Sequence, residues 1–280
     1  MPILHRPQTL EQACALMAEL QDAQVYGGGT AIQILMKQGI LFTEHFVDLS
    51  LVPGLTEITV TGSVASIGAM TPLRRVEMDP QLRQLLPLVA MTYGHVANPR
   101  VRNTATVGGN LAHGDYRLDP PAALLVLDAV VTAQSVRGTR EIPVREFFTG
   151  FQETALASDE LLTHVRIPLP PAGSSGWFVK LSSLGVNDWP AASAAALFLR
   201  DERKVLLQLG LCALADTPVF RSVDVTDLDG PNVAAAAVLA ADEAMAPIAD
   251  IRGKSDYKRR LGRVAVRDAV AGALEESTHA

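Results

Sequence analysis

Two polar turns rich in glycine, about 80 residues apart, constrain this chain more than any other feature of its sequence. The first, Gly27-Gly28-Gly29-Thr30, separates a short predicted strand at 24–26 from a helical run at 31–36. The second is Thr106-Val107-Gly108-Gly109-Asn110. Glycine lets a backbone approach a ligand closely, and the amides at a helix N-terminus lack helical partners. The two turns are therefore predicted to hold the two phosphates of one dinucleotide from opposite sides.

Simpler interpretations stay open for both turns and for an acidic residue near them. Neither turn completes a GxxxxGKS/T or GxGxxG pattern, so each could be a tight turn needed only for packing. Asp119 stands directly before Pro120-Pro121. Its carboxylate could accept hydrogen bonds from a ribose or ribityl hydroxyl. Alternatively, it could cap the helix predicted at 120–127.

Hydrophobic periodicity indicates an α+β chain with one clear boundary candidate. Apolar residues at spacings of three and four predict helices at 10–20, 82–95, 120–127, 233–245 and 255–274. Alternation and turn residues predict strands at 45–49, 58–69, 130–135, 140–144, 161–167, 177–181, 194–199 and 204–211, with a turn at 201–202. The stretch 168–176 holds three Pro, two Gly and two Ser among nine residues. We therefore place a domain border there.

Composition excludes several classes of protein. The chain has 24 Lys and Arg against 30 Asp and Glu, a net charge of −6, so we expect no nucleic-acid partner. It has no run of about 18 apolar residues and no signal-peptide pattern, so we expect no membrane span and a cytoplasmic location. Cys14 and Cys212 stand too far apart for a zinc or iron–sulfur motif.

Other chemistry is weakly indicated. No metal-binding spacing occurs among the six histidines, which are His5, His45, His95, His113, His164 and His279. A GxSxG turn is absent, so neither a metal site nor a catalytic side chain is predicted. The basic stretch at 252–263 also contains acidic residues at helical spacing. It is interpreted as a solvated or subunit-facing helix, and thus as a partner interface.

Six segments, in order along nearly the whole chain, together resemble one family. They are VYGGGTAIQILMKQG, HFVDL, SIGAMTPL, NPRVRNTATVGGNLAHGDYRLDPPAALLVLDA, SDELLTHVRIP and DIRGKSDYKRRL. This set resembles the FAD-binding medium subunit of the molybdenum hydroxylases, the xanthine dehydrogenase, carbon monoxide dehydrogenase and aromatic hydroxylase relatives. The resemblance implies a two-part FAD-binding domain of the vanillyl-alcohol-oxidase (PCMH) type over 1–170, with subdomains at about 1–57 and 58–170. It implies a C-terminal α+β domain of the CO dehydrogenase flavoprotein type over 177–280.

The resemblance also implies a set of flavin contacts. The two glycine turns would wrap the FAD diphosphate with backbone amides, the acidic position falls on Asp119, and Trp189 takes the place of an aromatic residue against the isoalloxazine ring. The implied set is Val25, Tyr26, Gly27, Gly28, Gly29, Thr30, Ala31, Ile32, Val96, Thr106, Val107, Gly108, Gly109, Asn110, Asp119, Leu162, Lys180 and Trp189. Alternatively, Val96 and Leu162 are plain core, Lys180 is a solvated strand residue and Trp189 is a packing aromatic.

Two departures from the family pattern bear on the flavin. Gly29 stands where relatives often have a His or Gln, and 112–116 (AHGDY) replaces an Asn-Ala-Asp-Pro run. Backbone donors survive such changes, so diphosphate binding is expected to persist, while the flavin potential or access to the ring shifts. His113, with Asp115 and Tyr116, is a candidate to shape the flavin edge, although a polar loop needs no function.

The function that the resemblance implies is electron transfer. The chain would bind FAD noncovalently and pass electrons from 2Fe-2S clusters on a small subunit to an external acceptor, while a large molybdopterin subunit oxidises the substrate, the whole assembling as a dimer of heterotrimers. A stand-alone FAD-dependent oxidase or reductase of the same fold is the alternative. A packing module that has lost its flavin is a third possibility.

Overall fold

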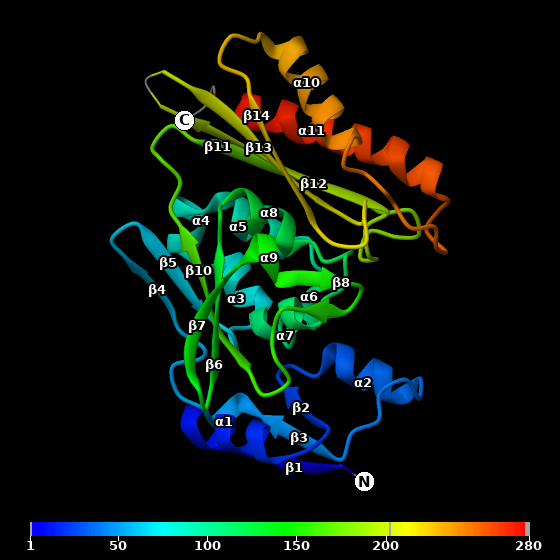
Figure 1. Ribbon diagram of the computed structural model, residues 1–280. Coiled ribbons are helices and arrows are strands. Elements are labelled where there is room, and N and C mark those ends of the chain that lie inside the picture. The colour runs from blue at the N-terminus through cyan, green and yellow to red at the C-terminus, as the bar shows by residue number, and fades with distance from the viewer. Residues whose placement is uncertain (1, 202, 278–280) are drawn as a thin grey trace.

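The computed structural model describes residues 2–201 and 203–277, which form three layers stacked along the long axis of the molecule (Figure 1). A small parallel sheet forms the N-terminal layer, an antiparallel five-stranded sheet with its helices forms the middle, and a four-stranded sheet with two helices forms the C-terminal layer. Glu202, in the turn predicted at 201–202, and His279 lie outside the described residues.

The N-terminal layer is a three-stranded parallel sheet of order β1-β3-β2 with α1 packed on it. α1 begins after Thr9, whose hydroxyl accepts a hydrogen bond from the Gln12 amide. α2, in contrast, buries none of its side chains. The elements are β1 (Ile3–His5), α1 (Leu10–Glu19), β2 (Ala23–Tyr26), α2 (Thr30–Lys37), β3 (His45–Asp48) and the 3₁₀ turn η1 (Leu49–Leu51).

The middle layer is built around the sheet β4-β5-β10-β6-β7. The helical run predicted at 82–95, which Pro87 interrupts, is two helices, and Pro87 begins the second one. The strands are β4 (Ile58–Thr61), β5 (Val64–Gly68), β6 (Val130–Ser135), β7 (Gly138–Pro143) and β10 (Leu161–Pro168), with a separate pair β8 (Phe148–Gly150) and β9 (Glu153–Thr154). The helices are α3 (Leu73–Met78), α4 (Pro80–Leu85), α5 (Pro87–Gly94), α6 (Pro99–Arg102), α7 (Val107–Ala112), α8 (Pro120–Val126) and α9 (Val144–Phe147).

The C-terminal layer is an antiparallel sheet in sequential order, buried on both faces. Along β12, Ala194 and Ala196 pack under α10 and α11, while Ala195 and Leu197 join the core of the middle layer. A Cβ at Gly210 of β13 would lie 2.1 Å from the Ala122 carbonyl oxygen of α8, so only glycine fits there. The elements are β11 (Ser175–Leu181), β12 (Ala192–Arg200), β13 (Val205–Cys212), β14 (Val219–Asp224), α10 (Gly230–Asp242) and α11 (Ser255–Ser277).

The structure confirms the α+β class and the long predicted elements, with two qualifications. The strands β1, β8, β9 and β14 and the short helices α3, α6, α7 and α9 were not predicted. β10 ends at Pro168 and β11 begins at Ser175, as a border at 168–176 requires. The hydrophobic core nevertheless continues across that border through Phe178, Ala195 and Leu197.

Candidate functional site

The first glycine turn takes a left-handed conformation that its neighbours require. Gly29 has φ +69° and is the N-cap of α2. A Cβ at this position would lie 2.2 Å from the hydroxyl oxygen of Tyr26, which accepts a hydrogen bond from Gln33 Nε2 at 3.0 Å. Glycine therefore suits this position, because φ is positive and the Tyr26 ring occupies the space beside it.

The first turn also leaves its backbone donors free. Within the described chain, none of the six N–H groups of residues 27–32 has a hydrogen-bond acceptor. The last three of them begin α2, so they stand at the positive end of its helix dipole. This part of the predicted phosphate site has the donors that a diphosphate needs.

The second turn differs, because four of its five amides are already used within the described chain. Thr106 caps α7, and its hydroxyl accepts a hydrogen bond from the Gly109 amide at 3.2 Å. The other amides donate to carbonyl oxygens: Val107 to Thr71 at 3.0 Å, Gly108 to Ala69 at 2.7 Å and Asn110 to Thr106 at 2.8 Å. The second turn thus leaves the Thr106 amide as its one backbone donor without an acceptor in the described chain, and its contact with the diphosphate stays a prediction. Its side-chain atom Asn110 Oδ1, in contrast, is buried without a partner in the described chain.

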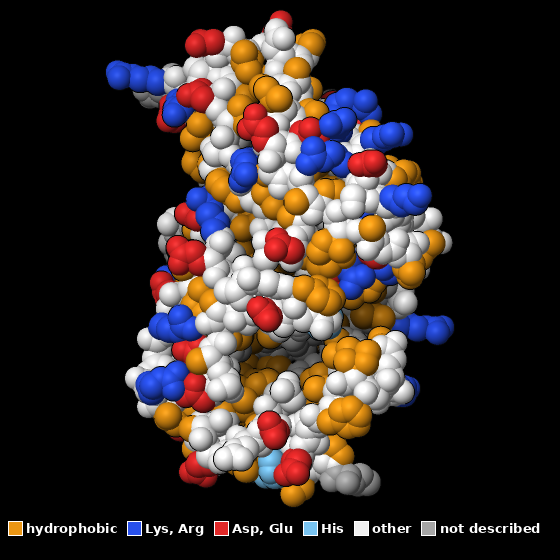
Figure 2. Space-filling view, turned by 45° about the vertical axis from the view of Figure 1, so that its right-hand side comes forward, with side chains coloured by type: hydrophobic (Ala, Val, Ile, Leu, Met, Phe, Trp, Pro, Cys, Tyr) orange, Lys and Arg blue, Asp and Glu red, His pale blue; other side chains and the backbone are white. Residues whose placement is uncertain are grey.

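The two turns touch each other instead of lying apart. A Cβ on Gly27 would lie 2.8 Å from Thr106 Oγ1, and one on Gly28 would lie 1.8 Å from the Thr104 carbonyl oxygen. Both glycines thus allow the first turn to approach the segment before α7. At this contact the two turns form one joined surface. At that point they therefore do not hold a ligand between them from opposite sides, as the sequence had predicted. Figure 2 shows a hollow between the N-terminal layer and the middle layer on the side where α2 lies.

Asp119 and Lys180 form a buried ion pair between α8 and β11. Lys180 Nζ lies 2.7 Å from Asp119 Oδ2 and donates to the His95 carbonyl oxygen at 2.9 Å, and both side chains are 4% exposed. Burial raises the pKa of Asp119 to about 6, and the Lys180 charge opposes that rise. Asp119 makes no capping bond to α8, and Lys180 is not solvated, so both of those alternatives are wrong.

Trp189 belongs to a small aromatic cluster at one edge of the middle layer. Its ring centroid lies 6.1 Å from that of His113, and the Arg117 guanidinium carbon lies 5.2 Å from the Trp189 ring. Burial lowers the pKa of His113, which favours the neutral ring. Gly114, next to it, has φ +66°; its amide donates to the Leu111 carbonyl oxygen and its own carbonyl oxygen accepts the Gln152 amide.

The two aliphatic candidates pack into the core. Leu162 is 6% exposed in β10, and Val96 packs against the same cluster while partly buried. The β10–β6 register shifts between Leu162 and His164. The structure favours the plain-core interpretation for both side chains, and a contact with flavin stays a prediction.

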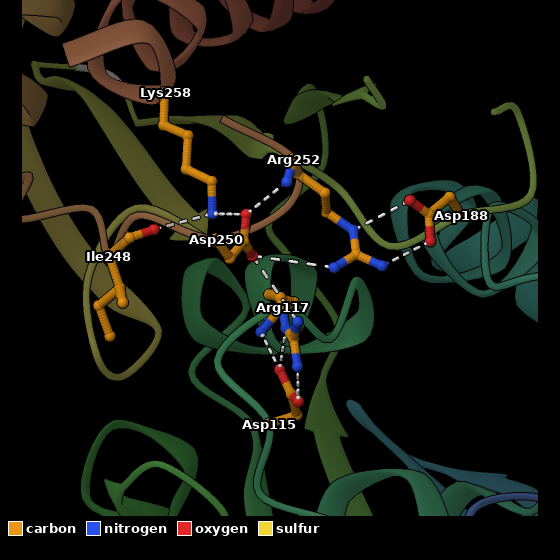
Figure 3. Close-up of polar contacts among 7 residues, drawn as sticks. All are labelled: Asp115, Arg117, Asp188, Ile248, Asp250, Arg252 and Lys258. Atoms are coloured by element: carbon orange, nitrogen blue, oxygen red, sulfur yellow. Dashed lines mark hydrogen bonds and ion pairs between the residues drawn. The ribbon is translucent and has the colours of Figure 1, made fainter. Parts of the chain in front are cut away.

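Sequence reasoning missed a network of six charged residues that links three segments (Figure 3). Arg117 forms a two-point pair with Asp115, with nitrogen–oxygen distances of 2.8 and 2.6 Å. Arg252 forms a similar pair with Asp188 at 3.0 and 2.7 Å. Asp250 lies between the two arginines and is paired with Lys258 at 2.8 Å. Residues 115–117, 188 and 250–258 are far apart in sequence, so no spacing rule connects them.

The network corrects one interpretation of the basic stretch. Lys258 is fully buried and Arg252 is 9% exposed, so neither faces a partner subunit. Arg259 and Arg263 bond Met245 and Asp242 of the same chain. Arg252 and Lys258 therefore hold the C-terminal layer together, while Arg259 and Arg263 are 39% and 46% exposed, and a partner interface at 252–263 stays a prediction for them.

Known proteins share this fold along its whole length. Residues 2–170 match the FAD binding domain in molybdopterin dehydrogenase. The carbon monoxide dehydrogenase medium chain of Afipia carboxidovorans is 33% identical over 273 residues, covering 95% of this chain and 94% of that one. The nicotine 6-hydroxylase medium subunit of Paenarthrobacter nicotinovorans is 32% identical over 273 residues, covering 95% of each chain.

Solved structures agree with these sequence matches. The reconstituted CO dehydrogenase from Oligotropha carboxidovorans contains a chain with a TM-score of 0.93 and 32% identity, covering 100% of this chain and 99% of that one. Quinoline 2-oxidoreductase from Pseudomonas putida 86 gives a TM-score of 0.89 at 26% identity, covering 99% and 98%. The fold and the joined glycine turns define a flavin-binding protein. This chain belongs to the family of FAD-binding subunits of the molybdopterin dehydrogenases.

The residues present fit FAD. The six free amides of the first turn suit a diphosphate, and the buried oxygens Asn110 Oδ1 and Asp119 Oδ1 have no partner in the described chain. A buried polar atom without a hydrogen bond costs about 1–3 kcal/mol, so donors on a bound ligand would remove that cost. Among residues 2–201 and 203–277, no helix is both long and apolar enough to cross a bilayer.

Proposed function

We propose that this chain is the FAD-binding electron-transfer subunit of a heterotrimeric molybdenum hydroxylase. It holds one FAD noncovalently, receives electrons from 2Fe-2S clusters on a small subunit and passes them to an external acceptor. A large subunit carrying molybdopterin oxidises the substrate. The flavin supplies the redox chemistry, and this chain supplies binding, orientation and electrostatics.

The observation that carries the proposal is the row of six free amides that opens α2. These donors bind the diphosphate, and the positive end of the α2 dipole adds to its attraction. Asn110 and Asp119 accept hydrogen bonds from the remainder of the nucleotide through the oxygens that have no partner in the chain. Lys180 keeps the Asp119 carboxylate in place at 2.7 Å.

The partners follow from the relatives. Two relatives are named as a medium chain or medium subunit, and each is covered over 94% or more of its length. We propose the same position for this chain, between a small and a large subunit, within a dimer of heterotrimers located in the cytoplasm. The domain border at 168–176 separates the flavin-binding part from the C-terminal layer, in keeping with a family match that ends at residue 170.

Flavin stoichiometry tests the proposal. The complex purified with its partner subunits should release about one FAD per copy of this chain on denaturation. Release of no flavin would refute it. A chain expressed alone that binds FAD and oxidises a nicotinamide or small substrate without partners would instead support the stand-alone oxidase or reductase.

A further inference from the structure

We propose that Asp250 and Asp188 of the charged network are positioning residues, which hold Trp189 and Arg117 beside the flavin site. The inference rests on the proposed function, because it takes the flavin ring to lie against Trp189. It assigns the C-terminal layer a part in setting the flavin environment, through contacts that reach the middle layer (Figure 3).

The first step is that Asp250 is itself rigidly held. Its Oδ1 accepts hydrogen bonds from Lys258 Nζ and from the Arg252 amide, both at 2.8 Å. Lys258 also donates to the Ile248 carbonyl oxygen at 2.9 Å and is fully buried. The backbones of Asp250 and Gly253 exchange two hydrogen bonds of 3.1 Å. The Asp250 carboxylate therefore has one fixed position, with Oδ2 turned toward the arginines.

The second step is that Asp250 completes the surroundings of Arg117. One edge of the guanidinium is paired with Asp115, and its remaining nitrogen lies 3.7 Å from Asp250 Oδ2. Its guanidinium carbon lies 5.2 Å from the centroid of Tyr116, 5.2 Å from that of Trp189 and 6.0 Å from that of Phe151. Carboxylates on its edges and aromatic rings around it leave Arg117 one orientation, in which it packs on Trp189.

The third step concerns the loop that carries Trp189. Residues 182–191 join β11 to β12, and the apolar side chains of Leu184 and Val186 on this loop are 59% and 88% exposed. The two-point bond between Asp188 and Arg252 ties the loop to the C-terminal segment one residue before Trp189. Residues 183–187 of the loop are exposed, so this tie and the Arg117 contact act together with the packing of Trp189 on His113 and the middle-layer core to fix the ring.

The balance of charges indicates that the six residues of the network act as one unit. The network contains three cations, Arg117, Arg252 and Lys258, and three anions, Asp115, Asp188 and Asp250. Its formal charge is therefore zero, and five of its six side chains are less than one fifth exposed. Removing one carboxylate leaves an uncompensated, poorly solvated cation, and the guanidinium it held is free to reorient.

The experiment compares variants in the purified, flavin-containing complex. Trp189→Phe removes the indole and should raise the fluorescence of the bound flavin, because a contacting indole quenches it. Asp250→Asn and Asp188→Asn keep the side-chain shape and should shift fluorescence and the visible circular dichroism of the flavin in the same direction. Asp242→Asn breaks the Asp242–Arg263 pair between α10 and α11, a matched control that should change neither signal.

Each outcome is decisive. A shared optical change in the Asp250 and Asp188 variants, with FAD content equal to wild type, supports positioning. A change in Trp189→Phe alone would overturn it. If Trp189→Phe bound FAD as the wild type does and its flavin fluorescence were unchanged, the positioning role would also be overturned. If wild-type complex contained no FAD, the proposed function itself would fail. Should Asp250→Asn not fold, Asp188→Asn still decides, because Asp188 lies on a surface loop and is 22% exposed.

Discussion

Replacing Ala31 by proline tests the free amides of the first glycine turn with the least structural change. Ala31 is the second residue of α2, and its amide has no acceptor in the described chain. Proline lacks that amide but is tolerated in the first turn of a helix, where the N–H is not needed for the helix. This chain already has proline at the second position of two helices, Pro121 in α8 and Pro231 in α10.

The size of the effect follows from the bond that is lost. A hydrogen bond from a backbone amide to a charged acceptor such as a phosphate oxygen contributes about 1.5–3 kcal/mol. Loss of one such bond should raise the Kd for FAD about 10- to 150-fold. The helix itself should persist, because the remaining residues of α2 and the Gly29 turn are unchanged.

The assay is FAD binding to the flavin-stripped protein, followed by flavin fluorescence. Glu11→Pro is the matched control, since it removes a first-turn amide at the second position of α1, a helix of the same layer. Its Kd should equal that of the wild type, and circular dichroism should show that both variants keep their helices. Wild-type affinity in Ala31→Pro would refute a diphosphate site at this turn.

Two further predictions concern stability. Burial raises the pKa of Asp119 to about 6 from 3.8, so the folded protein binds this proton more tightly than the unfolded chain does. The wild-type free energy of unfolding should therefore fall by up to about 3 kcal/mol relative to Asp119→Asn between pH 4 and 7. Urea unfolding of the two flavin-free proteins measures this free energy. A difference between them that does not change with pH would contradict the prediction. Gly210→Ala should destabilise by about 1–3 kcal/mol or more through the Ala122 carbonyl, whereas Gly230→Ala, in open space, should not. Equal unfolding midpoints would contradict that packing.

The secondary structure was predictable where a local pattern decides it. α1 has both its apolar spacing and its Thr9 cap in the sequence, and the hairpin of β4 and β5 has its turn at 62. α7 was not predictable, since its six residues include two glycines and a cap is its only local support. β14 lies on the edge of its sheet, and none of its residues is fully buried. The alternation of apolar and polar residues along it is therefore weak.

The glycine turns show the same limit at the site. Their sequence identifies backbone that can approach a ligand, but it does not say which amides the rest of the chain uses. Gly108 donates to Ala69, which lies 39 residues earlier, and a Cβ there would lie 2.7 Å from the Ala69 Cβ. Such a partner is set by the β5 and α7 packing, which only the fold reveals. In the first turn, the Tyr26 ring packs beside Gly29, and the Thr104 carbonyl oxygen packs beside Gly28 without accepting a hydrogen bond from the turn.

Buried charges explain why the layers take one arrangement. Lys180 of β11 pairs with Asp119, directly before α8, and Asp250 of the C-terminal layer lies 3.7 Å from Arg117 of the middle layer. A buried ion pair adds little net stability, because desolvation offsets most of its attraction, but removing one partner leaves a costly lone charge. A shifted C-terminal layer would strand several such charges at once, whereas the alanine-rich faces of β12 tolerate sliding more readily. We therefore attribute the register between the C-terminal layer and the flavin site to these pairs and the extent of burial to the apolar core.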